Sequence, residues 1–411
     1  MYVQLDVGWK HHPFPVSGFR IVSVDQIATL KELGLSEIRY FPRKSEPGLL
    51  AQDPAIGTPV DIRAAQSAAE LAAQGSAAFA SQALQNRAHL LLQNQILAAC
   101  DQRFGDATRQ YLAVERAALG QPEWARDQSE ALVSDCLREL LDNGDSVIRL
   151  LSEGVGESSA MHPVNVMVIS LLLGKTLGMK STELQGLGVA GLLHDLGKLN
   201  LPPAGGILGE RERYESHVGQ SVALAQQMGF ADAVLTAIAQ HHEMADGSGF
   251  PLHLMGEDMR RPGQILALVN HYDRMCNPVG GMEAPTPHEA LAMIFAQFKA
   301  RFDPVVLGAF IRMMGVYPPG SVVQLVNDRY AIVVSVNSSR PLRPKVIVHD
   351  SRIPKEEAPV LDLESLPELG IRRSLRPAQL ARDVLDYLSP RKRICYFFER
   401  AVDPGPDEAQ V

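Results

Sequence analysis

The sequence has little of what suits a protein to an oxidising compartment or to a membrane. Its 411 residues contain only four cysteines, widely spaced and without a CxxC pair, so neither a disulfide framework nor a zinc knuckle is indicated. The most apolar run, VMVISLLL at residues 166–173, is far too short to span a bilayer, and the N-terminus lacks the pattern of a signal peptide. We therefore expect a cytoplasmic protein without a membrane partner.

An excess of positive charge is also missing. The formal net charge is -8, because 47 Asp and Glu residues outnumber 39 Lys and Arg residues. Proteins that bind nucleic-acid polymers or membrane surfaces concentrate positive charge to neutralise phosphates, so both classes are disfavoured. A small anionic ligand remains compatible with this composition, because a local cationic site with metal ions can bind it.

What the sequence does contain predicts several units, since 411 residues are too many for one ordinary domain. Residues 1–60 alternate short β-like runs with turn residues and are expected to form a small α+β module. Residues 61–127 are rich in Ala, Gln and Leu, which favour long helices, so we interpret them as a helical connector. A connector of this kind could also support a homodimer, although clean heptads are missing.

The remainder of the chain is expected to be helical first and then partly β. Residues 128–320 keep a helical pattern. Residues 321–370 predict a β-meander whose first two strands flank an Asn327–Asp328 turn, and residues 371–411 predict a C-terminal helix and tail. The expected fold class is therefore mainly α, with the small N-terminal α+β module and a short C-terminal β-meander.

Histidines gather in the long helical region. His194 and Asp195, in LLHDLGK, follow apolar helical positions, and His241 and His242 continue an apolar stripe at helical spacing. One histidine alone is more often an ordinary core or surface residue. Several neutral imidazoles around a carboxylate, however, are costly to bury without a cation, and borderline metals bind this mixture of ligands. The sequence therefore predicts a metal site among five histidines, namely His162, His194, His217, His241 and His242.

These motifs resemble the HD-GYP phosphodiesterases, an offshoot of the HD phosphohydrolases. The matching residues are HDLGK at 194–198, HHEMADGSGFP at 241–251 and QILALVNHYD at 264–273, within a resemblance that covers about residues 130–320. The first module resembles a poorly characterised domain that often precedes HD-GYP domains. The resemblance implies an all-helical HD-type catalytic domain at 128–320 that hydrolyses cyclic di-GMP to pGpG or onward to GMP. It also implies two divalent metal ions, iron, manganese or similar.

The resemblance further implies roles for single residues. Asp195 is expected to bridge two metals in catalysis, and Lys198 to meet the substrate phosphate, although a solvated lysine at a helix end is the alternative. For the DGSG segment, a tight turn is an equal alternative to substrate binding. The metal ligands implied are His162, His194, Asp195, His217, His241, His242 and Asn270, and the substrate-binding residues are Lys198, Asp246, Gly247, Gly249 and Asp273.

Several positions depart from the family pattern. Asn270 stands where the family has its last metal-ligand Asp, Ser158 stands where a third metal would need a Glu, and Phe250 replaces the GYP tyrosine. The segment NPVGGMEAPTP, at 277–287, lacks the basic residues usual after the closing helix. Two metals at most are therefore expected.

Three functions stay open from the sequence. The first is a cyclic di-GMP phosphodiesterase in bacterial signalling. The second is a ligand-binding or scaffold protein that keeps the fold, has lost turnover and binds signalling partners, and Asn270 is the residue that separates these two. The third is a hydrolase of another phosphate substrate, because HD sites are chemically general.

Overall fold

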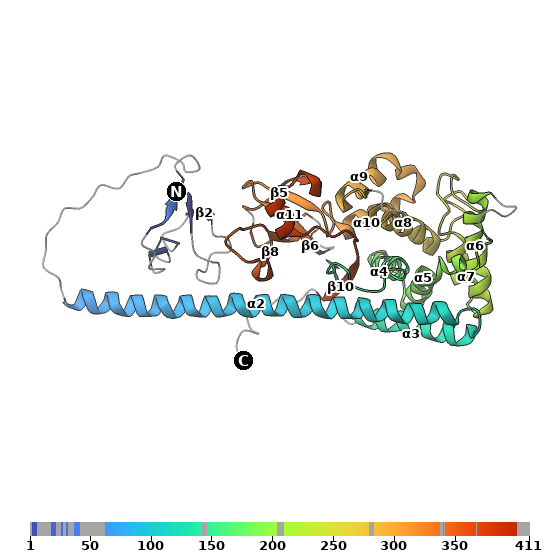
Figure 1. The fold of residues 1–411 in the computed structure, drawn as a ribbon, viewed down its shortest axis with the longest axis horizontal. Helices are drawn as coiled ribbons and strands as arrows, with labels where there is room; N and C mark the ends of the chain where they lie inside the picture. Colours follow the sequence, from blue (N-terminus) through green and yellow to red (C-terminus); the bar gives the residue numbers. More distant parts are fainter. Residues whose placement is uncertain are drawn as a thin grey trace. The chain divides into compact units, whose positions relative to one another are not determined.

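The structure is a computed structural model whose described residues fall into two units (Figure 1). One unit is drawn from residues 1–95 and 350–361, and the other from residues 96–349 and 362–411. The predicted division of the chain into five domains stays a prediction. The structure describes residues 2–5, 18–21, 26–27, 30–31, 37–41, 62–141, 146–203, 209–278, 283–337, 340, 342–366 and 368–400.

The first unit contains a three-stranded antiparallel sheet. Its strands are β1 (Tyr2–Gln4), β2 (Gly18–Arg20) and β3 (Arg39–Tyr40), in the order β2-β1-β3. Val3, Leu5 and Leu30 form its small buried core. The rest of the predicted N-terminal module lies largely outside the described residues.

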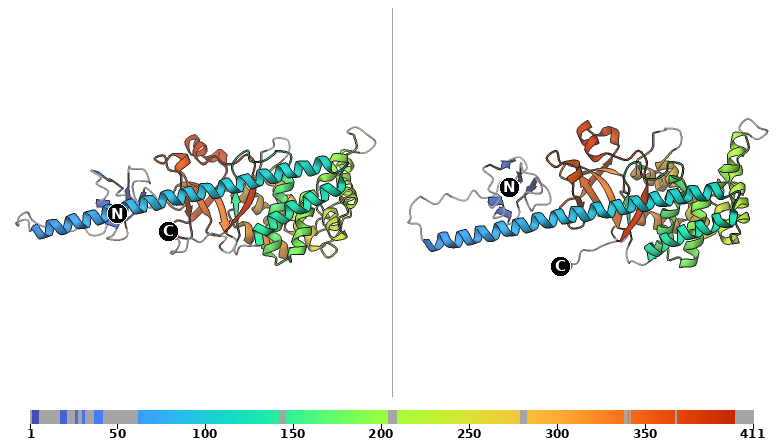
Figure 2. Two further views of the ribbon diagram at one scale, coloured as in Figure 1. Left: turned by 90° about the horizontal axis from the view of Figure 1, so that it is seen from below. Right: turned by 60° about the horizontal axis from the view of Figure 1, so that its bottom comes forward.

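The predicted long helix is confirmed. Helix α2 (Ile62–Ala117) runs without a break for 56 residues, and α3 (Pro122–Leu141) follows it after a short turn (Figures 1 and 2). Within the second unit, α2 buries Phe104, Tyr111 and Val114, while α3 buries one apolar face. The part of α2 that belongs to this unit is therefore held by a hydrophobic core.

The helical domain is built around two helices that are buried on nearly every side. In α4 (Met161–Thr176) and α5 (Ser181–Leu193) most residues are apolar and buried, as expected for helices with little solvent face. Helices α4 and α5 pack on each other, and α4 also packs on α8. The surrounding elements are η3 (Leu196–Asn200), α6 (Glu210–Gln227), α7 (Asp232–Ala239), α8 (Arg261–Cys276), α9 (Pro287–Gln297), η4 (Lys299–Arg301) and α10 (Pro304–Met314).

A mixed set of early and late strands forms the sheet of the second unit. The predicted hairpin around Asn327–Asp328 is confirmed as β5 (Val322–Leu325) paired antiparallel with β6 (Tyr330–Asn337), and β7 (Lys345–Val348) also pairs with β6. The strand order is β10-β4-β6-β5-β9. The other strands are β4 (Ser146–Leu150), β8 (Val360–Asp362), β9 (Ile371–Leu375) and β10 (Tyr396–Arg400).

Two local predictions are wrong. Strand β4 interrupts the stretch 128–320 that was expected to be helical, because it lies between β10 and β6 and buries consecutive residues, Val147 to Leu150. The predicted C-terminal helix is short, since α11 covers only Arg382–Leu388 after the turn η6 (Pro377–Gln379), and β9 occupies its expected start. The mainly α class with a β-meander is otherwise confirmed. No helix in the described ranges is long and apolar enough to cross a membrane.

Candidate metal centre

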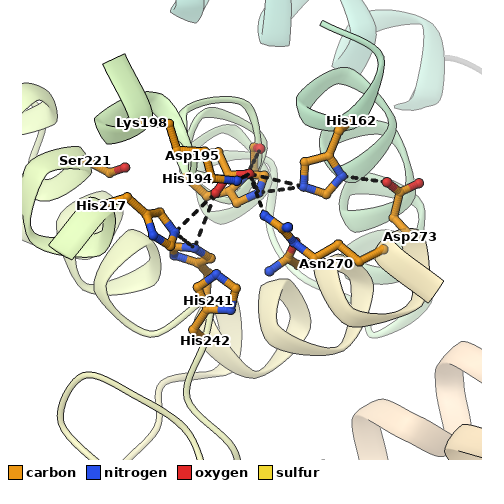
Figure 3. Close-up of polar contacts among 12 residues, drawn as sticks. His162, His194, Asp195, Lys198, His217, Ser221, His241, His242, Asn270 and Asp273 are labelled. Carbon is orange, nitrogen blue, oxygen red and sulfur yellow. Dashed lines mark hydrogen bonds and ion pairs between the residues drawn. The ribbon is translucent and has the colours of Figure 1, made fainter. Parts of the chain in front are cut away.

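The histidines and the aspartate predicted from the sequence converge in the second unit (Figure 3). All of them are buried except His162, whose side chain is 23% exposed. They come from separate elements, because His162 begins α4, His194 and Asp195 join α5 to η3, His217 lies in α6, and His241 and His242 follow α7.

Each of four imidazoles is oriented by a hydrogen bond from Nδ1. The Nδ1–H groups of His194 and His241 donate to the carbonyls of Gly191 and Ile238, at 2.7 and 2.6 Å, and that of His217 donates to the carbonyl of Tyr214. His162 donates in the same way to Oδ2 of Asp273, at 2.6 Å. A carbonyl or a carboxylate only accepts, so the proton lies on Nδ1 and each Nε2 is left as a lone-pair donor.

These Nε2 atoms point at one another and at Asp195. The Nε2 atoms of His162 and His194 lie 3.2 Å apart, and each lies within 3.5 Å of Asp195 Oδ2. The Nε2 atoms of His217 and His241 lie 3.3 Å apart, at 3.3 and 3.9 Å from Asp195 Oδ1. Lone pairs that face lone pairs in a buried site need a cation between them.

By its donor set, this arrangement could bind metal ions. We call His162, His194 and Asp195 the first metal group, and Asp195, His217, His241 and His242 the second metal group; the ligand atoms of each lie within 4.8 Å of one another. In the second group, Asp195 Oδ1 is buried and accepts no hydrogen bond from the residues that the structure describes. An orphaned carboxylate oxygen beside three imidazoles is the ligand set of a borderline divalent metal.

The other oxygen of Asp195 is occupied by two side-chain cations. Lys198 Nζ donates to Oδ2, and Nη2 of Arg274 donates to the same oxygen at 2.8 Å. Burial alone would raise the pKa of Asp195, but its electrostatic interaction with His194 and its contacts with the side chains of His162 and His217 hold that pKa well below its usual value. Asp195 is therefore an anion, and the positive charges beside it are needed to keep it so.

Asn270 lies in α8 at the expected place, with its amide engaged by the protein. Its Oδ1 accepts a hydrogen bond from Arg274 Nε at 2.9 Å, and its side chain is buried. Sequence reasoning missed Arg274, although its position four residues after Asn270 in one helix is the spacing at which side chains meet.

Asp273 orients other groups of the site. Besides accepting from His162, it accepts at Oδ1 from the side-chain amides of Asn165 and Asn277. Asn277 also binds the backbone just before β10. Its Oδ1 accepts from the N–H of Ile394, and its Nδ2 donates to the carbonyl of the same residue. The orientation of His162 thus depends on the C-terminal strand.

The comparisons with known proteins agree with this geometry. Residues 145–306 match the family model described as HD domain, and residues 1–142 match one described as a domain of unknown function, DUF3391. The chain is 27% identical over 382 residues to cyclic di-GMP phosphodiesterase PA4108 of Pseudomonas aeruginosa, which covers 88% of this chain and 86% of that protein. Residues 145–306 of this chain form an HD domain.

Two further similarities cover less of the proteins concerned. The cyclic di-GMP phosphodiesterase response regulator RpfG of Xanthomonas campestris pv. campestris is 30% identical over 149 residues, which are 34% of this chain and 39% of that protein. The solved structure of Bd1817, an HDG"Y"P protein from Bdellovibrio bacteriovorus, is 18% identical with a TM-score of 0.38, over 49% of this chain and 68% of that one.

In this HD domain the segment after His242 forms a tight turn. Asp246 is exposed and accepts hydrogen bonds from the N–H and the hydroxyl of Ser248, while Gly247 has a φ of 74°. A Cβ on Gly249 would lie 2.3 Å from the nitrogen of Met244, so only glycine fits. The structure thus places Asp246, Gly247 and Gly249 in a turn and outside both metal groups, and their role in substrate binding stays a prediction.

Glu243 and Phe250 connect this turn to the candidate metal centre. Buried Glu243 accepts from the N–H groups of Leu252 and Leu254, at 2.6 and 2.9 Å, and so fixes the loop that follows the two histidines. Phe250 stacks on the ring of His242 with 4.4 Å between the ring centroids. Phe250 keeps the ring of the family's tyrosine and uses it to hold a metal-group histidine.

A cavity of about 240 Å³ opens beside the first metal group of the HD domain. Its wall includes Asp195, Ser158, and the cationic side chains of Lys198, Arg274 and Arg393. Arg393 comes from the segment before β10, outside the matched HD region. The loop that lacks the family's basic residues includes residues 279–282, which lie outside the described residues. Among the described residues, the cations in the wall of this cavity are Lys198, Arg274 and Arg393.

Burial keeps most of the histidines neutral. It lowers the pKa of His194, lowers that of His241 well below its usual value and, together with the nearby charge of Arg274, lowers that of His242 to about 2. Burial would also lower the pKa of His162, but its hydrogen bonds to Asp195 and Asp273 raise it. The imidazoles of His194, His241 and His242 are therefore uncharged at neutral pH.

The metal-free protein is expected to lose stability as the pH falls below about 6.5, the ordinary pKa of histidine. Between that pH and their lowered pKa values, His194, His241 and His242 bind protons only when unfolded, so the free energy of unfolding falls by up to about 1.4 kcal/mol per pH unit for each. The raised pKa of His162 offsets part of this loss. Urea unfolding with a chelator at pH 7.5, 6.5 and 5.5 measures the effect, and a midpoint independent of pH would contradict it.

Proposed function

We propose that this chain is a metal-dependent phosphodiesterase that hydrolyses cyclic di-GMP to pGpG, and onward to GMP, in bacterial second-messenger signalling. The observation that carries the proposal is the buried Oδ1 of Asp195, which has three imidazoles around it and no hydrogen bond among the described residues, next to a cavity with three cations. The names of the relatives support cyclic di-GMP as the substrate.

The first and second metal groups would hold the ions, iron, manganese or similar. When bound, divalent ions supply Lewis acidity at phosphorus and lower the pKa of a water molecule. The protein itself supplies orientation, because the carbonyl and carboxylate acceptors of the Nδ1–H groups fix each imidazole before any ion arrives. It also supplies burial, which strengthens every charge interaction in the site.

Lys198, Arg274 and Arg393 are proposed to bind the phosphodiester. Guanidinium groups match the two oxygens of a phosphate, and an ammonium group adds a point charge. Lys198 is paired with Asp195 and lies 5.7 Å from the ring centre of Tyr214, so it is not a freely solvated lysine. The cavity is smaller than the range of roughly 300–1,000 Å³ usual for ligand sites, so it would receive only part of a cyclic dinucleotide.

The test is hydrolysis of cyclic di-GMP by the full chain loaded with Mn²⁺ or Fe²⁺, with pGpG and GMP separated by chromatography. Arg393→Ala is expected to raise KM about tenfold with little change in kcat, because a cation that binds a phosphate away from the reacting atoms contributes to substrate binding. Arg312→Ala, an exposed arginine in α10, is the matched control. Equal KM values for the two variants would remove Arg393 from the substrate site.

A second candidate is favoured by one observation. The neutral Asn270 gives its oxygen to Arg274, so the first metal group lacks the carboxylate that the family resemblance leads one to expect. A ligand-binding or scaffold protein with little turnover is the function that this favours. Binding of cyclic di-GMP by the Mn²⁺-loaded chain, without any pGpG or GMP after prolonged incubation, would decide for it. Cleavage of a different cyclic dinucleotide in the same assay would decide for another phosphate substrate.

A further inference from the structure

We propose that Arg274 acts as a built-in cation on the His162 side of Asp195. In consequence, this protein holds one divalent ion tightly, in the second metal group, and a second ion only weakly, in the first. The inference deepens the function proposed above and rests on its metal centre. It concerns two residues of α8, Asn270 and Arg274, that sequence motifs alone do not connect.

The two oxygens of Asp195 have opposite surroundings. Oδ2 accepts from Arg274 Nη2 at 2.8 Å and from Lys198 Nζ, while Oδ1 accepts nothing from the described parts of the chain. A carboxylate oxygen offers about two lone pairs for such contacts, so Oδ2 is saturated. An ion entering the first metal group must displace one of these cations, whereas an ion entering the second group meets a free oxygen.

Asn270 holds the guanidinium in place. Its Oδ1 accepts from Arg274 Nε at 2.9 Å, so a single guanidinium joins the expected metal ligand to the bridging carboxylate. Asn270 is buried, and Arg274 is about 29% exposed, which leaves the guanidinium only partly screened by water. With aspartate at 270, a negative charge would attract an ion there; asparagine brings no charge, and its oxygen instead accepts from the Arg274 guanidinium.

The surrounding charge therefore disfavours an ion in the first metal group and not in the second. An ion in the first metal group would lie within a few ångströms of Arg274, and like charges at this range repel strongly in a partly buried site. The second metal group has three imidazoles and one carboxylate oxygen that accepts no hydrogen bond from the described residues. The guanidinium thus takes over, on the first side, the neutralisation of Asp195 that an ion would otherwise provide.

The experiment is titration of the full chain with Mn²⁺, followed by equilibrium dialysis with metal analysis and by electron paramagnetic resonance. We expect one tight equivalent in the natural chain, with the spectrum of isolated Mn²⁺. In the double variant Arg274→Ala, Asn270→Asp, the second equivalent should tighten by about tenfold or more. Its spectrum should then show coupling between neighbouring ions. The control is Arg261→Ala, because Arg261 is an exposed residue of the same helix α8 and pairs with Asp303. This variant should leave the affinities for both equivalents of Mn²⁺ unchanged.

Two single variants make the test independent of whether the double variant folds. His162→Ala should keep the tight equivalent at its natural affinity, while His217→Ala should lose it. Two equivalents of similar affinity with a coupled spectrum in the natural chain would overturn the inference, as would loss of the tight equivalent in His162→Ala. Metal counting does not require turnover: a chain with one tight Mn²⁺ and no phosphodiesterase activity would refute the proposed function and support this inference.

Discussion

Asp195→Asn should lower the hydrolysis of cyclic di-GMP by roughly 1,000-fold, because charge stabilisation of this kind is the largest contribution in comparable sites. Asp195 is the only residue shared by both metal groups, and its free Oδ1 faces the three imidazoles of the second. An amide keeps the size and one oxygen but brings no charge. Tightly bound Mn²⁺ should be lost together with activity, as measured by metal analysis after gel filtration and by product chromatography.

The control for this variant is Asp232→Asn, an exposed carboxylate in the first turn of α7. It changes the net charge by the same amount away from the site and should keep both metal and activity. Circular dichroism must show natural helix content in both variants. Retained metal and activity in Asp195→Asn would rule out the proposed centre.

Gly197→Ala is expected to lower the free energy of unfolding by about 3 kcal/mol and to disorganise the metal centre. A Cβ at this position would lie 2.2 Å from the carbonyl oxygen of His217 and 2.4 Å from the nitrogen of Ser221. Both atoms are backbone, so no side-chain rotation relieves the overlap. Segment η3 would have to move away from α6, and Asp195 and Lys198 would move with it relative to His217. Urea unfolding and Mn²⁺ affinity measure the two effects.

Gly219→Ala is the matched control in α6. This glycine is exposed, and an added Cβ meets nothing within 4 Å. Alanine in a helix interior should therefore raise the free energy of unfolding by about 0.5–1 kcal/mol and leave metal binding unchanged. Similar effects from both substitutions would show that the close approach of η3 to α6 is not what makes Gly197 necessary.

Helical spacing predicted part of the candidate metal centre, and the family resemblance added His162 and His217. The apolar pattern before His194 and before His241 predicted buried imidazoles, and the structure brings them together around Asp195. The reason is local: three of the oriented histidines use a carbonyl three residues earlier in their own turn, which any helical turn provides.

What the sequence could not predict depends on contacts between distant segments. Strand β4 pairs with β10, about 250 residues later, so no local pattern marks it as a strand inside a helical stretch. The sequence shows Arg274 only as an ordinary residue in the last turn of α8, and its contact with Asp195 exists because α8 packs against α5, which Asp195 follows. Asp273 was predicted to bind the substrate, and that role stays a prediction. Its hydrogen bond with His162, which orients the imidazole, also joins distant segments and could not be predicted from the sequence.

The tie between the centre and β10 bears on when the centre can form during synthesis. Asn165 and Asn277 hold Asp273, and both also bind the backbone of residues 394–396. Chains emerge from the ribosome N-terminus first, and domains tend to fold in that order. The matched HD region ends at residue 306, so all its histidines leave the ribosome well before their last support does. In a nascent chain the orientation of His162 is therefore not fixed until β10 has been synthesised.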